Sequence, residues 1–400
     1  MVCDRLFRWV CALCLLFSSW EGFAQDCWVG TWATAPQLVE PHNMPPAPGL
    51  SGNTLRQIVR VSIGGERVRL RLSNAFSDSA LVVKSVTISS VTCKEKPSGN
   101  LFAEFCFGGK KGVKIEAGKE VFSDPLRFGL KSDSEVALTI TYGDVPRKLT
   151  GHPGSRTTSY LFRGGRAEAD KIDAAVKTDH WYTISALEVE SSAAHAVAVI
   201  GNSITDGRGS GTNQQNRWTD VFSKSLLRNA STSHIGVLNL GIGGNCVLRG
   251  GLGPTASSRY ERDILSQHGV KWVILFEAVN DLGSIPSAEQ AGRTVEQLIT
   301  AYREMIRKAK EKGLKVYGAT ITPFGRSFYD KDFRLAARDK LNHWIRTSGE
   351  FDAVIDFDAV MRDDSNLSVL KDGLHTGDYL HPNEKGYLLM GNSIDLNLFK

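Results

Sequence analysis

The stretch Ala196-Val-Ala-Val-Ile-Gly-Asn-Ser-Ile-Thr-Asp-Gly207 joins an unbroken apolar run to a glycine and a serine. Five consecutive apolar residues, 196–200, are typical of a parallel strand that is covered on both faces. Gly201 permits a sharp turn, and from Trp218 onward apolar residues recur at helical spacing. The stretch therefore predicts a strand, a tight turn and a helix. It places Ser203 at the carboxyl end of the strand, where open α/β sheets bind their ligands.

Short β-rich runs and helical patterns alternate through the rest of the C-terminal half. The β-rich runs are 235–240, 272–276, 315–320 and 353–357. The clearest helical pattern runs from Val295 to Ala309, and Gly313 follows it as a C-terminal cap. This alternation predicts a parallel sheet with helices on both faces.

Three further stretches occur in this half, and the first two place Gly244 and Asn280 after the carboxyl ends of predicted strands. They are Asn239-Leu-Gly-Ile-Gly-Gly-Asn245, Glu277-Ala-Val-Asn-Asp-Leu-Gly283 and Asp378-Tyr-Leu-His-Pro-Asn-Glu-Lys-Gly-Tyr387. Together with Gly201-Asn-Ser-Ile204 they resemble the four blocks of the SGNH (GDSL) hydrolase family. The resemblance implies an α/β fold with a flavodoxin-like parallel sheet. Residues 28–156 resemble, less specifically, the β-rich extension that precedes this domain in larger secreted members.

Ester hydrolysis needs a nucleophile, a base, an orienting carboxylate and donors for the oxyanion. The resemblance gives the catalytic roles to Ser203, Asp378 and His381, and the oxyanion hole to Ser203, Gly244 and Asn280. A histidine suits the role of base because its ordinary pKa is near 6.5. The site is expected to use no metal and no organic cofactor.

The Asp-x-x-His spacing occurs twice, because Asp372 and His375 precede Asp378 and His381. Spacing alone cannot choose between the two pairs. The second pair is favoured because the Pro-Asn-Glu-Lys-Gly-Tyr run that follows it resembles the last block of the family. His375 is then expected to be a loop residue near the cleft.

Two residues depart from the family pattern. Asn202 stands where the family usually has aspartate, and Ala278 stands where it usually has glycine. Asparagine retains one acceptor oxygen, so Asn202 can still brace the turn. Alanine adds a methyl group, which is tolerable unless that position requires a positive φ.

The N-terminal half is rich in alternating strand patterns. Residues 59–63 and 68–72 each alternate apolar and polar residues around Gly64-Gly65, which predicts a hairpin. Similar runs at 81–90 and 136–142 predict an all-β sandwich or a jelly-roll-like domain. Within it, His152 and Arg156 are interpreted either as part of a structural turn at the domain junction or as part of a loop that faces the hydrolase cleft.

A chain of 400 residues with 42% apolar content is long enough for two cores. The predicted division is a signal peptide at 1–24, a β domain at 25–190 and a hydrolase domain at 191–400. The signal is inferred from Arg5 and Arg8, the apolar run that follows them, and the small residues Gly22 and Ala24 before the predicted cleavage site. The expected location is therefore secreted or periplasmic. No later run is long enough to suggest a membrane span.

Seven cysteines are present, and four lie after the predicted signal. Cys93 and Cys106 flank a polar segment and are interpreted as a disulfide across a loop. Cys27 and Cys246 are more distant, and Cys246 is interpreted as a small buried residue. No cysteine or histidine spacing indicates a metal site.

The net charge of +5 without a Lys/Arg block gives no signature of nucleic-acid binding. The resemblance implies a secreted serine esterase that acts on a small-molecule or glycan ester, and acetyl esters of carbohydrates are favoured. The alternatives are a lipid or aryl esterase and a non-catalytic glycan-binding protein.

Overall fold

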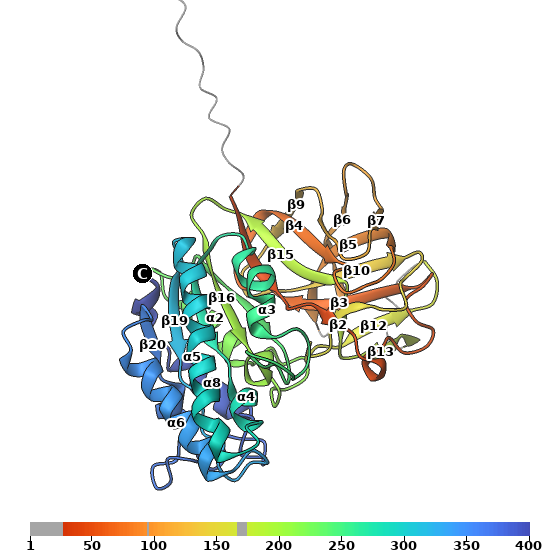
Figure 1. Ribbon diagram of the computed structural model, residues 1–400. Helices are drawn as coiled ribbons and strands as arrows, with labels where there is room; N and C mark the ends of the chain where they lie inside the picture. The colour runs from red at the N-terminus through yellow and green to blue at the C-terminus, as the bar shows by residue number, and fades with distance from the viewer. Residues whose placement is uncertain (1–26, 94–95, 166–173) are drawn as a thin grey trace, which may run out of the picture.

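The computed structural model describes residues 27–93, 96–165 and 174–400, with side chains from 92 to 101 excluded. The predicted signal peptide lies outside the described residues. A β domain and an α/β domain lie side by side, with the predominantly helical layer on one side of Figure 1 and the antiparallel sheets on the other. Among the described residues, no helix is both long enough and apolar enough to cross a membrane.

The β domain contains two larger antiparallel sheets and one small sheet. The first sheet comprises β1 (Trp28–Ala33), β15 (Ile184–Glu190), β4 (Gly65–Ser73), β8 (Glu120–Phe122) and β9 (Leu126–Leu130). The second comprises β13 (Val176–Thr178), β12 (Ser159–Phe162), β3 (Thr54–Arg60), β10 (Glu135–Tyr142), β5 (Leu81–Cys93), β6 (Lys96–Phe105) and β7 (Val113–Ile115). The small sheet comprises β14 (Trp181–Tyr182), β11 (Thr150–His152) and β2 (Gln37–Leu38), which precedes the short helix η1 (Pro41–Asn43). Val59 and Leu70, from different larger sheets, belong to one buried apolar cluster, as expected of a sandwich.

The predicted hairpin around Gly64-Gly65 is wrong. Strand β3 pairs with β10 and β12, whereas β4 pairs with β15, β8 and β9. The two glycines therefore carry the chain from one sheet to the other. Alternation correctly identified two strands, but β3 is buried on both faces, and alternation does not specify which strand lies beside which.

The predicted disulfide is also wrong, because Cys106 is a free thiol. In the β5–β6 ladder, Cys93 lies opposite Lys96, whereas Phe105 lies opposite Val86. The two cysteines therefore lie near opposite ends of the ladder, on the order of 20 Å apart at ~3.3 Å per residue. Such a separation is far beyond the reach of a disulfide.

The C-terminal half is built on a five-stranded parallel sheet in the order β17 (Ile235–Gly241), β16 (His195–Gly201), β18 (Val270–Phe276), β19 (Lys315–Ala319) and β20 (Ala353–Ile355). In chain order this is 2-1-3-4-5, the flavodoxin-like arrangement that the sequence predicted. Strand β16 lies between β17 and β18, which both follow it in the chain, so the direction of the strand order reverses at β16. The carboxyl end of β16 is therefore the expected place for a ligand crevice.

Helices cover both faces of this sheet. The helices of the α/β domain are α1 (Ser203–Asp206), α2 (Trp218–Arg228), α3 (Ala256–Tyr260), η3 (Glu261–Leu265), α4 (Val279–Gly283), α5 (Ala288–Glu311), α6 (Asp332–Thr347), α7 (Phe357–Met361), α8 (Glu384–Asn392) and η4 (Leu396–Phe399). Val197 and Val199 pack in a cluster with α2, α7 and α8. Ala198 and Ile200 face the other way, into the cluster that contains α5 and α6. The continuous apolar run is thus explained by burial on both faces.

The two domains share one apolar core. Residues of the sandwich and residues of β16, β17 and α5 belong to the same buried cluster. At the contact, the N–H of Gly30 donates to the carbonyl of His268 at 3.1 Å, and the N–H of Val237 donates to Oγ of Ser62 at 3.1 Å. Strand β15 ends at Glu190 and β16 begins at His195, so the connection between the domains is short.

Candidate active site

Ser203 lies at the carboxyl end of the central strand of the parallel sheet. Strand β16 ends at Gly201, where a Cβ atom would overlap the side chain of Thr205, so the turn requires glycine. Asn202 has an extended backbone and caps α1, because its Oδ1 accepts the N–H of Ile204 at 3.1 Å. Ser203 is the first residue of α1, so its own N–H has no acceptor one turn earlier in the helix.

The structure brings Ser203, His381 and Asp378 together in a hydrogen-bonded chain. Ser203 Oγ lies 2.9 Å from His381 Nε2, and His381 Nδ1 lies 2.6 Å from Asp378 Oδ2. The other carboxylate oxygen of Asp378 accepts the N–H groups of Leu380 at 3.0 Å and His381 at 2.9 Å. Asp378 thus fixes both the backbone and the ring of His381, which leaves Nε2 to accept the serine proton.

The surroundings of this pair favour an ionised carboxylate and a neutral imidazole. Burial alone would raise the pKa of Asp378, but hydrogen bonds from the ring and backbone of His381 hold that pKa well below its ordinary value. Burial lowers the pKa of His381, and the charges of Arg208 and Arg156 lower it further, whereas Asp378 acts in the opposite direction. A neutral histidine is the form that can act as a base.

The competing pair lies apart from the serine. His375 Nδ1 accepts the N–H of Gly377 at 3.0 Å, and its ring packs on Tyr379 at 4.2 Å between centroids. Asp372 Oδ1 lies 4.0 Å from Nε2 of His375, which is beyond a hydrogen bond. His375 is not among the residues that line the cleft around Ser203, so its contacts are those of a structural loop residue.

Gly244 and Asn280 both line the cleft that contains Ser203 and His381. Asn280 Oδ1 accepts the hydroxyl of Tyr329 at 3.0 Å, and its Nδ2 donates to the carbonyl of Asn245 at 2.7 Å. These bonds fix which way the amide points, and they use only one of its two N–H groups. Gly244 has a φ of +71°, a conformation suited to glycine.

The cleft lies between the two domains and has a volume of about 370 Å³. The β domain contributes a mostly polar wall made of Gln37, Glu40, Asn43, Pro153, Gly154, Arg156 and His180. The α/β domain contributes the site itself together with Asp206, Arg208, Gly243, Leu252, Phe328, Tyr329 and Leu380. Sequence reasoning missed most of this wall because its polar residues are scattered along the chain and form no motif.

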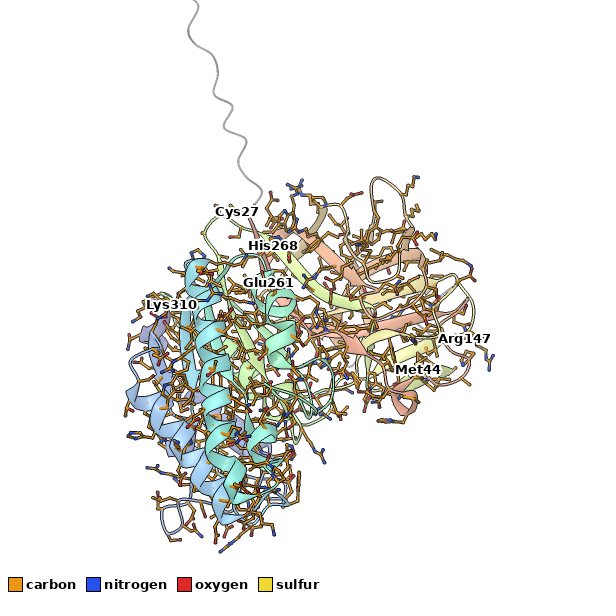
Figure 2. All side chains as sticks on the ribbon, viewed as in Figure 1. Cys27, Met44, Arg147, Glu261, His268 and Lys310 are labelled. Carbon is orange, nitrogen blue, oxygen red and sulfur yellow. The ribbon has the colours of Figure 1, made fainter. Side chains whose placement is uncertain are left out.

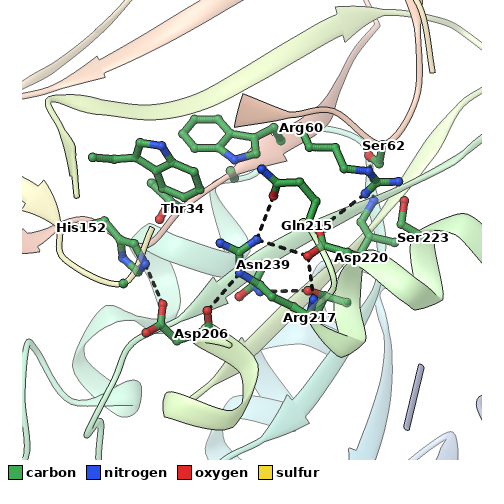
Figure 3. A pocket seen from close by; sticks show the side chains of 16 residues that line it. Thr34, Arg60, Ser62, His152, Asp206, Gln215, Arg217, Asp220, Ser223 and Asn239 are labelled. Atoms are coloured by element: carbon green, nitrogen blue, oxygen red, sulfur yellow. Dashed lines mark hydrogen bonds and ion pairs between the residues drawn. The ribbon is translucent and has the colours of Figure 1, made fainter. Parts of the chain in front are cut away.

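His152 and Arg156 hold the β domain against α1. His152 Nε2 lies 2.8 Å from Asp206 Oδ1, and Arg156 Nη2 donates to Asp206 Oδ2 at 3.2 Å. Figure 3 shows His152 and Asp206 facing one another at the edge of a small polar pocket between the domains. Arg156 also lines the catalytic cleft. The segment is therefore both a structural part of the domain junction and a loop that faces the cleft, so both interpretations apply.

Asn202 and Ala278 both donate hydrogen bonds to a buried carboxyl group, that of Glu277. Asn202 Nδ2 donates to Glu277 Oε2 at 3.3 Å, and the N–H of Ala278 donates to the same oxygen at 3.2 Å. Ala278 has a φ of +82°, so this position does adopt the conformation that favours glycine.

Burial raises the pKa of Glu277 to about 8, although the charge of Arg259 acts in the opposite direction. Arg259 lies 3.5 Å from Glu277 but closer to Asp263, at 3.1 Å, and it also binds the backbone carbonyl of Gly201. One buried guanidinium therefore lies within ion-pair distance of two carboxylates. A pKa of about 8 favours the protonated form of Glu277 near neutral pH.

Comparison with known proteins identifies one matching family model. Residues 199–389 match the model of the GDSL-like Lipase/Acylhydrolase family. No protein of curated function matches the chain significantly.

Solved structures of similar proteins cover about half of the chain. A lipolytic protein of the G-D-S-L family from Desulfitobacterium hafniense DCB-2 is 22% identical, covers 50% of this chain and 96% of its own, and has a TM-score of 0.38. A GDSL-like lipase from Bacteroides thetaiotaomicron VPI-5482 is 18% identical, covers 51% and 87%, and has a TM-score of 0.37. A variant of an acetyl xylan esterase from Geobacillus stearothermophilus is 19% identical, covers 51% and 94%, and has a TM-score of 0.39.

The fold and the family match define the class of protein. Residues 199–389, in the α/β half, match a GDSL-like lipase/acylhydrolase domain, and antiparallel β-sheets precede them. The chain is accordingly a carboxylic ester hydrolase.

Proposed function

We propose that this chain is an exported serine esterase that removes acetyl groups from carbohydrates through an acyl-enzyme. The observation that carries the catalytic part is the hydrogen-bonded chain of Ser203, His381 and Asp378 at the floor of the interdomain cleft. Export is inferred from the order of charged, apolar and small residues in 1–24.

In the proposed reaction, Ser203 Oγ attacks the ester carbonyl while His381 Nε2 takes the serine proton. Negative charge forms on the former carbonyl oxygen. In this proposal, the N–H groups of Ser203 and Gly244 and the second N–H of Asn280 stabilise that charge. His381 then gives its proton to the leaving alcohol, which departs as the Ser203 acetyl ester forms. A water molecule, deprotonated by His381, then attacks the acetyl carbon; the bond to Ser203 Oγ breaks, acetic acid leaves, and His381 returns the proton to Ser203 Oγ.

The composition of the cleft supports a sugar as the alcohol. Glu40 is held in place by hydrogen bonds from Gln37 at 2.7 Å and Asn43 at 3.0 Å, which gives the β-domain wall an ordered set of polar groups. Phe328 is 69% exposed at the cleft, and its ring lies 4.2 Å from that of Tyr329. An exposed aromatic ring in the same cleft as these polar groups suits a sugar, which has an apolar ring face and hydroxyl edges.

The proposal can be tested by measuring acetate release from acetylated monosaccharides, acetylated xylan and p-nitrophenyl acetate, with p-nitrophenyl palmitate as a long-chain comparison. We expect wild-type protein to release acetate from the sugars, and we expect Ser203→Ala to release none. Faster hydrolysis of palmitate than of acetate would instead identify a lipid esterase. Absence of hydrolysis, together with no labelling of Ser203 by a fluorophosphonate, would identify a non-catalytic glycan-binding protein.

A further inference from the structure

Two arginines line the cleft beside Ser203 and His381. Arg156 belongs to the β domain, and Arg208 follows α1 in the α/β domain, so the two guanidinium groups come from opposite sides of the domain junction. Their charge reaches the catalytic imidazole, because both lower the pKa of His381. Both groups are therefore close enough to the reaction centre to act on a bound substrate.

The backbones of both arginines are held in place. Arg156 has a φ of +52°, and its carbonyl accepts the N–H of Asn213 at 3.0 Å. The carbonyl of Arg208 accepts the hydroxyl of Tyr387, a fully buried residue of α8, at 2.7 Å. A residue other than glycine at positive φ persists only where its surroundings fix it.

The acidic residues of the cleft leave much of this positive charge unpaired. Asp206 is occupied by His152 and by one nitrogen of Arg156, while Glu40 is held by two neutral amides. Among the residues that the structure describes, Arg156 Nε is buried without an acceptor. No carboxylate in that part of the chain forms an ion pair with Arg208, whose side chain is exposed at the cleft.

We infer that Arg156 and Arg208 form an anion subsite, and that the preferred substrate is an acetylated sugar that carries a carboxylate. This inference rests on the proposed function and narrows it to esters of sugar acids. A guanidinium pairs with a carboxylate through charge-assisted hydrogen bonds, often two at once. The subsite lies in the same cleft as Ser203, so the carboxylate and the ester belong to one small molecule or to one residue of a glycan.

The first measurement compares acetate release from two substrates that differ only in the acid group, namely an acetylated methyl glucoside and the matching acetylated methyl glucuronoside. We expect kcat/KM to be ~10-fold to 100-fold higher for the acid, the range of a charged hydrogen bond. Arg208→Gln should remove most of this preference. Arg147→Gln is the matched control, because Arg147 is exposed at the far edge of the β domain in Figure 2 and does not line the cleft.

A second measurement tests binding without sugar-ester turnover. Glucuronate should inhibit hydrolysis of p-nitrophenyl acetate at a concentration at least ~10-fold lower than glucose, and Arg208→Gln should abolish this difference. Equal hydrolysis of the two sugars, with equal inhibition by glucuronate and glucose, would overturn the anion subsite and leave the proposed function intact. Hydrolysis of p-nitrophenyl acetate but of neither sugar, again with equal inhibition, would overturn both.

Discussion

The Nε2 atom of His152, in the β domain, lies 2.8 Å from Oδ1 of Asp206, on the short helix that begins with Ser203. The other ring nitrogen of His152 lies 2.9 Å from the carbonyl oxygen of Ala35. Both ring nitrogens of His152 therefore face an oxygen atom. Burial alone would raise the pKa of Asp206, but His152, Arg156 and Arg217 hold that pKa below its ordinary value. The β domain therefore supplies part of the support for the nucleophile.

Replacing His152 by alanine should destabilise the protein. The change leaves the buried carboxylate of Asp206 without its closest partner, and loss of a hydrogen-bond partner of a buried polar group costs ~1–3 kcal/mol. Urea unfolding at pH 7 would measure this, with His42→Ala as the control because His42 is exposed. The difference in the free energy of unfolding between wild type and His152→Ala should shrink as the pH falls below about 4. A carboxylate with a lowered pKa contributes stability only above that range. Equal stability of the two variants at pH 7 would contradict this role.

The two histidines of the repeated Asp-x-x-His spacing should differ sharply in activity. His381→Ala should lower kcat for p-nitrophenyl acetate ~10⁴-fold or more, as Ser203→Ala should, because nucleophile and base act as one unit. His375→Ala should cost less than ~10-fold, since His375 contacts Gly377 and Tyr379 instead of the cleft. Circular dichroism of the three variants would control for folding. The opposite order of the two histidine variants would reverse the assignment.

The pH dependence of the reaction should follow the lowered pKa of His381. The base must be neutral, so the acid limb of kcat/KM should lie below pH ~6.5, the ordinary value for histidine. Arg208→Gln removes one positive charge that lowers this pKa, and so it should move the limb to higher pH. A neutral ester is the appropriate substrate, and Arg147→Gln should leave the limb where it is. A limb that does not move in Arg208→Gln would show that this charge is screened from the imidazole.

The parallel sheet could be predicted because its signals are local. The continuous apolar run before Gly201 and the polar stretches at the ends of β17 and β18 mark strand ends without reference to distant residues. The contact between His152 and Asp206 has no such signal, since it joins two domains across 54 positions. The same limit explains the errors at Gly64-Gly65 and at Cys93 and Cys106. In both cases the outcome depends on which strands pair and in which register, and alternation alone does not determine either.

Asn202→Asp restores the residue that is usual in the family at nearly constant shape. The sequence alone therefore predicts retained or increased activity. The structure predicts a cost in stability, because the new carboxylate would replace the amide that donates to buried Glu277. Glu277 has a pKa of about 8 in the fold and about 4.3 when unfolded, so it stabilises the fold less as the pH rises through this window. With a second carboxylate beside it, ionisation of Glu277 becomes still more costly.

Unfolding of Asn202→Asp should therefore resemble that of wild type near pH 5, where Glu277 can donate its proton to the new carboxylate. At pH 9 the variant should be less stable by ~1–3 kcal/mol, the cost of an unsatisfied buried polar group. Adding Glu277→Gln should restore most of this loss, because the glutamine amide can donate in place of the proton. Asn366→Asp, at an exposed position, controls for the added charge. A loss that is independent of pH would show that Glu277 does not sense residue 202.

Ala278→Gly should stabilise the protein, although most replacements of a buried alanine by glycine do the opposite. Ala278 is fully buried at φ +82°, where an alanine is strained by ~1–2 kcal/mol and a glycine is not. Loss of the buried methyl group costs ~0.8 kcal/mol, and the greater freedom of glycine in the unfolded chain offsets a further part of the gain. The expected net change in the free energy of unfolding is a gain of up to ~1 kcal/mol. Ala186→Gly, in strand β15 and also fully buried, should instead lose ~1 kcal/mol or more. Urea unfolding of both variants would measure the difference, and equal losses would show that residue 278 is not strained.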